Sequence, residues 1–127
     1  MDVWRMIQML DDVADGDAIP RPDLDAAIWA SLVTMPANPF YIANFQALQA
    51  GLALQILKWQ AAEDAERTGQ ADPRSFIWRA GFYDLVLLVV LLTKGHAGAM
   101  KHAKTVMHLY GEQLDVYLKE FSLCPIQ

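Results

Sequence analysis

The sequence predicts an all-α fold, arranged as one bundle of about five helices in a single domain, residues 1–127. Apolar residues recur at intervals of three and four along several segments, which is the spacing of one face of an α-helix. Residues that start and stop helices bracket these segments, and no segment alternates as a half-buried strand does. The 127 residues, 54% hydrophobic and 20% charged, are enough for one core.

The segment 73–94 is the predicted centre of the bundle, because its ends carry helix signals. Asp72 and Pro73 supply an N-cap acceptor and a first-turn proline. Lys94 and Gly95 supply a cation near the last carbonyls and a residue suited to a left-handed cap. A segment bracketed in this way is too long for a strand, so we expect a helix.

Every side chain in residues 85–92 is apolar, so a helix here must be surrounded by protein or by lipid. A membrane span requires ~20 apolar residues. Arg79, Asp84 and Lys94 make this run shorter than that. We therefore expect the helix to be buried among the other helices.

Four further helices follow from the same signals, over residues 2–14, 23–35, 39–68 and 98–121. The first three have N-cap candidates and stop signals: Asp2 and Gly16, Asp23 and Pro36, Asn38 and Gly69. In 23–35 the expected inward residues are Leu24, Ala27, Ile28 and Leu32. The last helix has the expected inward seam Met100, Ala103, Met107, Tyr110, Leu114, Tyr117 and Phe121, with Gly111 inside it.

The helix 39–68 has two apolar stripes rather than one. The first is Phe45, Leu52 and Trp59, and the second is Ala43, Ala47, Ala50, Leu54, Leu57 and Ala61. A helix with two apolar stripes needs neighbours on two sides. We therefore expect this helix to be extensively covered.

The net charge of −5 arises in residues 1–25, which hold seven aspartates and two arginines. An acidic chain lacks the dominant basic surface of a general nucleic-acid binder. The high hydrophobic fraction favours a homo-oligomer, most simply a homodimer, because an obligate interface resembles a core. The only cysteine, Cys124, cannot form an internal disulfide, and the N-terminus lacks a signal-peptide pattern. We expect a cytoplasmic protein.

Asp84 is the first candidate for chemistry, because it lies where the helix becomes wholly apolar. If partly desolvated, its carboxyl group could act as a general acid or base, and the carboxylate could also bind a metal. The structural alternative is an ion pair or hydrogen bond with Arg79, Lys58 or a tyrosine hydroxyl. An isolated carboxylate lacks a second catalytic group, which favours this alternative.

Glu63 and Glu66 lie on one helix face and could bind one divalent cation. They resemble the Glu-x-x-Glu pair of the all-α nucleotide pyrophosphohydrolases of the MazG type, which carry a Glu-x-x-Asp pair on the next helix. Asp84 matches one member of that second pair, but Gly81 stands three residues before it. The resemblance implies a metal-dependent hydrolase. A solvated helix end, with Glu63 paired to Arg67, explains the same residues.

Basic residues cluster in the segment 94–108: Lys94, His96, Lys101, His102, Lys104 and His108. On a helix, one face would carry Lys101, Lys104, Thr105 and His108. Such a face near a helix start could bind phosphate or a nucleotide, helped by backbone N–H groups, or could simply be solvated. The histidines are spaced onto different faces, so no metal site is predicted.

These observations favour a small non-enzymatic binding protein, either an adaptor or inhibitor of another protein or a ligand-sequestering protein, that acts as a homo-oligomer. An enzyme is less favoured, because no complete catalytic constellation is present. One alternative is a phosphate or nucleotide binder that uses residues 94–108. The other is a MazG-like hydrolase that uses Glu63, Glu66 and Asp84. No cofactor, membrane contact or general nucleic-acid binding is expected.

Overall fold

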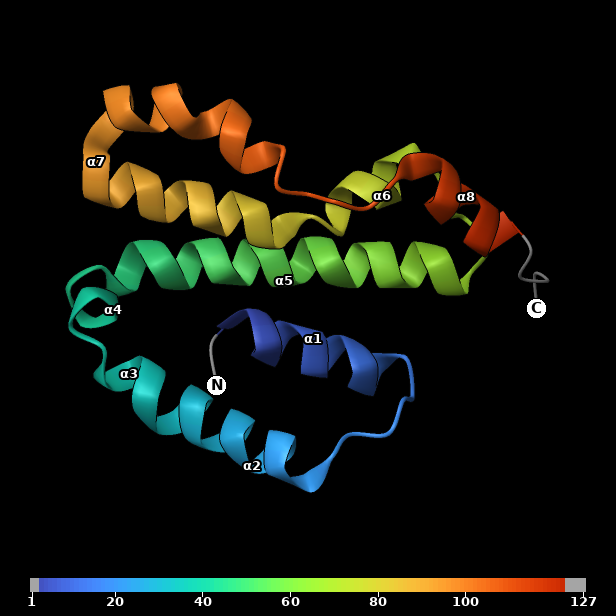
Figure 1. Ribbon diagram of the computed structural model, residues 1–127, viewed down its shortest axis with the longest axis horizontal. Coiled ribbons are helices and arrows are strands. Elements are labelled where there is room, and N and C mark those ends of the chain that lie inside the picture. The colour runs from blue at the N-terminus through green and yellow to red at the C-terminus, as the bar shows by residue number, and fades with distance from the viewer. Residues whose placement is uncertain (1–2, 123–127) are drawn as a thin grey trace. The chain divides into compact units, whose positions relative to one another are not determined.

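A computed structural model describes the backbone of residues 3–122 and the side chains of residues 5–121 (Figure 1). All regular structure in this part of the chain is helical, which confirms the all-α class. The chain divides into two compact units, Met1–Phe45 and Gln46–Gln127. The expectation of a single domain stays a prediction.

The first unit is a helical hairpin followed by a short helix. Its elements are α1 (Val3–Ala14), α2 (Arg21–Trp29), the π-helical segment η1 (Ala30–Thr34), α3 (Met35–Ala37) and α4 (Pro39–Ala43). The predicted helix 2–14 is confirmed over the described residues, and Gly16 ends it with φ +78°. The predicted cap Asp2 lies outside the described residues.

The second helix differs from the prediction at both ends. It begins after Pro20, and Asp23 lies in its first turn and does not cap it. It also continues through Pro36 to Ala37. The π-type hydrogen bonds of η1 stand directly before this proline, whose missing N–H breaks the ordinary α-helical ladder at that point. The helix ends at Asn38, whose side chain caps α4 as predicted.

Small residues, not the large apolar ones, occupy the buried face of this helix. Ala27 and Ala30 are buried, together with Met9 of α1. Leu24, Ile28 and Leu32, which we expected to face inward, are exposed, and Leu32 is 72% exposed. The inward prediction is therefore right only for Ala27.

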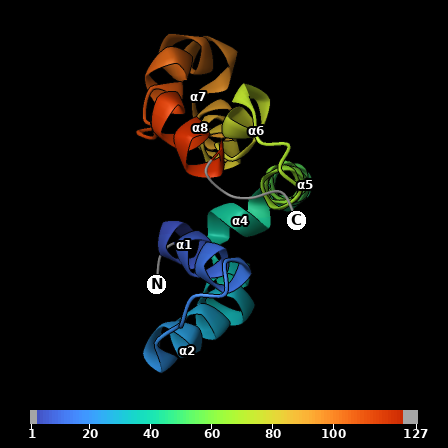
Figure 2. The ribbon, with the colours of Figure 1, turned by 90° about the vertical axis from the view of Figure 1, so that its right-hand side faces the viewer.

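The second unit contains α5 (Phe45–Arg67), α6 (Pro73–Trp78), α7 (Gly81–Met107) and α8 (Leu114–Ser122). Figure 2 looks along α5, with α7 folded into two halves beside it. The predicted helix 39–68 is interrupted at Asn44, which has φ −118° and ψ 23°. The side-chain amide and the backbone N–H of Asn44 both donate to the carbonyl of Phe40, at 3.0 Å and 3.1 Å, and so hold the end of α4.

The predicted helix 73–94 is also divided. Ala80, with φ −84° and ψ 19°, separates α6 from α7. Gly95 then turns α7 back on itself, with φ 72° and ψ −175°. The two halves, residues 81–94 and 96–107, lie side by side (Figures 1 and 2). The left-handed glycine predicted at position 95 is confirmed, but it joins two half-helices within one element.

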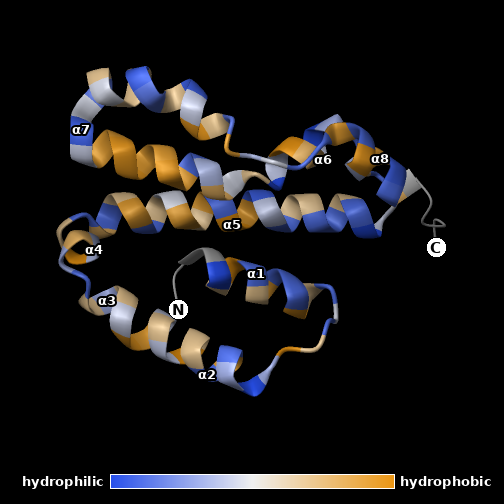
Figure 3. Ribbon diagram, viewed as in Figure 1, coloured by the Kyte–Doolittle hydropathy of each residue, from blue (hydrophilic) through white to orange (hydrophobic). Residues whose placement is uncertain are grey.

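The first half of α7 is the most apolar part of the chain (Figure 3). The expectation that it is buried is wrong: its apolar residues are half-buried at best, and Leu91 is exposed. Helix α5 and the second half of α7 cover it only in part. By length and composition alone, α7 is one helix that could cross a membrane.

Glycines set the close contact between α5 and α7. A Cβ atom on Gly51 would lie 2.6 Å from the Leu88 side chain. A Cβ atom on Gly81 would lie 2.6 Å from the Gln55 side chain and 3.3 Å from its backbone oxygen. The two backbones therefore approach as closely as they do because side chains are missing at these points.

The last predicted helix, 98–121, is wrong as one element. The chain is non-helical between Met107 and Leu114, and Gly111 lies in this connection. The expected inward seam is therefore broken, and Met100 is 66% exposed. The apolar residues keep their spacing of three and four through residues 108–113, although the backbone there is not helical.

Candidate functional site

The N-terminus of α6 organises a polar cluster in the second unit. The Asp72 carboxylate accepts the N–H groups of Arg74 at 2.8 Å and Ser75 at 3.2 Å, which confirms the predicted cap. The Ser75 hydroxyl in turn accepts the N–H of Asp72 at 2.9 Å, completing a capping box. This reciprocal cap holds Ser75 at 0% exposure.

Tyr117 of α8 joins this cap to α5. Its hydroxyl lies 2.6 Å from the Ser75 hydroxyl and donates to the Glu66 carboxylate at 2.9 Å. Three elements that are distant in sequence therefore meet at one buried phenol. Its ring packs against those of Phe76 and Phe121, with centroid distances of 5.4 Å and 4.9 Å.

Arg79 links two carboxylates across the same cluster. Its Nη1 atom lies 3.5 Å from the Glu66 carboxylate and its Nη2 atom 3.7 Å from that of Glu112. The guanidinium also stands 5.5 Å from the Tyr117 ring centroid, within cation–π distance. Because Glu66 is almost completely buried, the positive charge of Arg79 offsets the cost of burying its carboxylate.

Tyr110 completes the set that we call the tyrosine–arginine cluster: Glu66, Ser75, Arg79, Tyr110, Glu112 and Tyr117. The Tyr110 hydroxyl lies 3.0 Å from the Phe76 carbonyl and 2.9 Å from the Glu112 carboxylate. Burial raises the pKa of Tyr110, and the carboxylate of Glu112 adds to the effect. The phenols therefore stay protonated and act as hydrogen-bond donors that join α5, α6, α8 and the segment between α7 and α8.

Burial, with a further contribution from Glu66, raises the pKa of Tyr117 from 10.0 to about 12. The unfolded chain would therefore lose this phenolic proton at lower pH than the folded chain. We expect the Tyr117 contribution to the free energy of unfolding to be constant below pH 10.0 and to be lost as the pH rises to about 12. Urea unfolding from pH 9 upward measures this. The free energy of unfolding of Tyr117→Phe should fall less steeply with pH than that of the wild type. Identical slopes would contradict the view that Tyr117 has a raised pKa in the folded chain.

Asp84 forms the ion pair with Lys58 that was one of the predicted alternatives. Their Oδ2 and Nζ atoms are 2.5 Å apart, and both side chains are half-buried. The Gln55 amide nitrogen, in the orientation that satisfies its neighbours, lies 3.2 Å from the same oxygen and 3.1 Å from the Gly81 carbonyl. The Lys58 ammonium therefore offsets the negative charge of the Asp84 carboxylate, and the Gln55 amide donates a hydrogen bond to it, where α5 meets α7.

The structure does not bring Glu63, Glu66 and Asp84 together. Glu66 is engaged by Tyr117, and Asp84 by Lys58. Within the described residues of the second unit, no three His, Cys, Asp or Glu side chains lie close enough to share a metal ion. The geometry therefore gives the hydrolase hypothesis no metal site.

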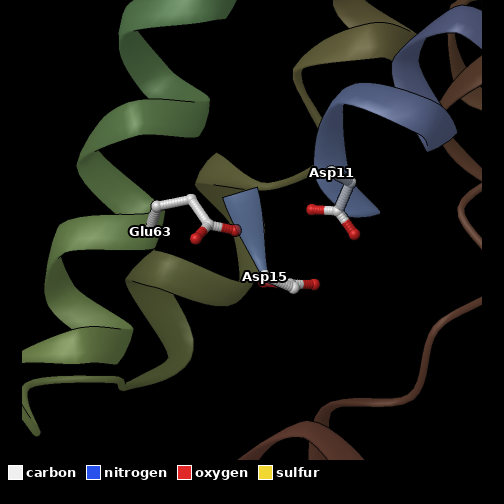
Figure 4. A group of neighbouring side chains, drawn as sticks. All are labelled: Asp11, Asp15 and Glu63. Carbon is white, nitrogen blue, oxygen red and sulfur yellow. The ribbon is translucent and has the colours of Figure 1, made fainter. Parts of the chain in front are cut away.

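Figure 4 draws Glu63 with Asp11, which lies in α1, and Asp15, which directly follows α1. Asp11 and Asp15 belong to the first unit and Glu63 to the second, and the positions of the two units relative to one another are not determined. Within the first unit the two aspartates lie one helical turn apart, and the Asp15 N–H donates to the Asp11 carbonyl at 2.9 Å. Two such aspartates offer too few ligands for a calcium site.

The predicted anion-binding residues share an exposed face: Lys101, Lys104, Thr105 and His108. Three of the four lie in the last turn of α7 or directly after it, since the helix ends at Met107. The backbone groups left unpaired at that end are carbonyls, not the N–H groups that would help to bind phosphate. Anion binding by these residues stays a prediction, without the expected help from a helix start.

Large apolar side chains are exposed in both units. Those of the second unit are Leu54, Ile56, Leu57, Ile77, Leu91, Met100, Met107, Leu109, Leu114 and Val116. On α5 the predicted second stripe is exposed along the whole helix: Ala47, Ala50, Leu54, Leu57 and Ala61. We call these five residues the outer stripe of α5.

Three comparisons with known proteins found no match to this chain. No family model matches the chain, and neither a curated protein nor a solved structure is similar to it.

Sequence reasoning missed the tyrosine–arginine cluster. One local signal was available, because Asp72 and Ser75 have the spacing of a capping box. Tyr110 and Tyr117 were both predicted to face inward, but as parts of one continuous helix. Their polar role depends on Glu66 and Arg79, which no spacing rule connects to them.

Proposed function

We propose that the chain is a non-enzymatic helical binding protein that acts as a homo-oligomer, in which further copies cover the outer stripe of α5. The observation that supports this most is the lack of an enclosed core. Although 54% of the residues are hydrophobic, no large apolar side chain among the described residues is fully buried. Half of the buried apolar residues in the described part of the chain are alanines, and most of the larger ones keep 7–8% of their surface exposed. A chain of this composition leaves apolar area for partners to remove from water.

The outer stripe of α5 fits a second helix. Its residues follow one another at intervals of three, four, three and four, which is the seam of a coiled coil. Its largest members, Leu54 and Leu57, are 57% and 62% exposed. The residues beside it include Gln46 and Gln60, which are uncharged. Two copies can therefore meet along this stripe without like-charge repulsion.

The same geometry argues against the enzyme alternative. A hydrolase of the MazG type needs carboxylates free to hold a cation, whereas Glu66 and Asp84 are already engaged by Arg79 and Lys58. The described polar groups are satisfied, since no buried side-chain nitrogen or oxygen among them lacks a partner. The cytoplasmic location stays a prediction.

Leu54→Glu tests the proposal. Because Leu54 is exposed in the single chain, the glutamate should leave that chain folded, but in an oligomer it would be an unpaired buried charge. We expect the dissociation constant of the oligomer to rise by roughly 100-fold or more. Native mass spectrometry and light scattering across a dilution series measure this.

Gln49→Glu is the matched control, because it adds the same charge to the same helix outside the stripe, at an exposed position. It should change the dissociation constant by less than roughly fivefold, as expected for an exposed charge. A wild-type chain that stays monomeric at every concentration would overturn the proposed function. An oligomer that tolerates Leu54→Glu would place its interface elsewhere.

A further inference from the structure

We propose that the outer face of the second half of α7 docks on an anionic lipid surface. This face, which we call the basic methionine face, consists of Met100, Lys101, Lys104, Met107 and His108, all exposed. It is separate from the outer stripe of α5. The inference therefore does not depend on the oligomer proposed above.

The charge of this region is opposite to that of the whole chain. No acidic residue occurs between Asp84 and Glu112, whereas this interval holds Lys94, Lys101 and Lys104. The net charge of the chain is −5. Neither Lys101 nor Lys104 pairs with a carboxylate in residues 5–121. Their ammonium groups are available to a negatively charged surface.

Exposed apolar side chains are interleaved with these lysines. Met100, Lys104 and Met107 succeed one another at intervals of four and three, so they run along one edge of the face. Met100 is 66% exposed, and Leu109 follows the helix on the same segment and is also exposed. Flexible thioethers can enter the headgroup region, while lysine stems extend their charges to the phosphates. This combination is typical of helices that lie in the plane of a membrane interface.

The geometry favours surface docking over a span. Residues 81–94 form a half-helix of roughly 21 Å, shorter than the ~30 Å hydrocarbon layer. The turn at Gly95 prevents the second half from continuing it. The two halves of α7 therefore present an outer face to a surface and do not form one continuous helix long enough to span the bilayer.

The same features argue against two other anionic partners. A soluble phosphate needs donors that converge on one point, whereas Lys101 and Lys104 follow one another along a helix whose nearer end presents carbonyls. A nucleic-acid backbone would leave Met100 and Met107 in water. Of these three anionic partners, a lipid surface is the one that uses the charges and the apolar side chains together.

Vesicle co-sedimentation of the full chain tests the proposal. One set of vesicles contains phosphatidylcholine alone, and the other contains phosphatidylglycerol and phosphatidylcholine in equal parts. We expect binding to the anionic set and loss of most of that binding in 0.5 M salt, because added ions screen the lysines. Lys101→Ala plus Lys104→Ala should lower the partition coefficient by roughly 25-fold, at about fivefold per lysine.

Arg67→Ala plus Lys119→Ala is the matched control, since it removes two exposed positive charges from α5 and α8. It should change the partition coefficient by less than threefold. Met100→Ser plus Met107→Ser should weaken binding while leaving the charge unchanged. These are surface positions, and circular dichroism checks that each variant remains helical.

Several outcomes would overturn the inference. They are no binding to anionic vesicles, equal binding to both vesicle sets, or lysine and control variants that behave alike. Equally tight binding to polyphosphate or to a short RNA, with no effect of the methionine pair, would instead identify a soluble polyanion as the partner. None of these results bears on the oligomeric state, which the dilution series measures separately.

Discussion

Replacing Tyr117 by alanine should lower the free energy of unfolding by about 3–5 kcal/mol, the range for removing a buried aromatic side chain. Tyr117 is 3% exposed and packs between aromatic rings of α6 and α8. Its hydroxyl also bonds to Ser75 and Glu66, so one substitution removes both the packing and the polar link. Urea unfolding monitored by circular dichroism gives the free energy.

Tyr117→Phe separates these two contributions. It keeps the ring and removes the hydroxyl that donates to the Glu66 carboxylate, so its expected cost is about 1.5–3 kcal/mol. Hydrogen exchange should show that Tyr117→Ala exposes the amides of α8 more than those of α5. Uniform loss of protection, or equal costs for the two variants, would contradict the view that this phenol fastens α8 to the unit.

Gly95→Ala should lower the free energy of unfolding by about 1–3 kcal/mol, the cost of holding a side chain in a backbone region that glycine alone occupies readily. With φ 72° and ψ −175°, Gly95 reverses the direction of α7. Apart from the neighbouring residues and the adjacent helix backbone, no atom lies within 4 Å of the added Cβ, so the cost would be conformational and not steric crowding. Urea unfolding measures it.

Gly111→Ala is the control for this substitution. Gly111 also lies in a non-helical part of the chain, but it does not have a positive φ. Its added Cβ would meet only the Leu109 carbonyl oxygen, at 4.0 Å. We expect a change within roughly 0.5 kcal/mol. If both alanines cost the same, the turn at position 95 does not require a left-handed residue.

The parts of the fold that the sequence predicted correctly depend on local signals. Asn38 and Asp72 cap helices because a side-chain oxygen reaches N–H groups two and three residues later. Gly16, Gly69 and Gly95 all have positive φ, as expected of residues that end a helical run. These interactions are complete within a few residues, so tertiary packing did not alter them.

The predictions that failed concern burial and helix continuity. Residues 85–92 are apolar on every face, but the second unit has too few helices beside them to enclose them. The period of the last predicted helix continued through Gly111, although the backbone leaves the helix after Met107. Period and composition indicate which residues avoid water; they do not say whether this chain or a partner covers them.

The candidate sites divide in the same way. The pairing of Asp84 with Lys58 was among the alternatives, because a half-buried carboxylate needs a cation and few were available nearby. The link from Ser75 through Tyr117 to Glu66 was not foreseen, because it joins positions on three elements. Only the folded chain determines which of several distant phenols and carboxylates meet.

The glycine contacts between α5 and α7 limit which substitutions this protein can accept. At Gly51 the obstacle is the far end of the Leu88 side chain, which a different rotamer or a shorter residue would remove. At Gly81 part of the obstacle is the backbone oxygen of Gln55, which no substitution elsewhere can shorten. Position 51 can therefore enlarge if position 88 shrinks with it, whereas at position 81 a backbone oxygen remains 3.3 Å from any added Cβ whichever side chain stands at position 55.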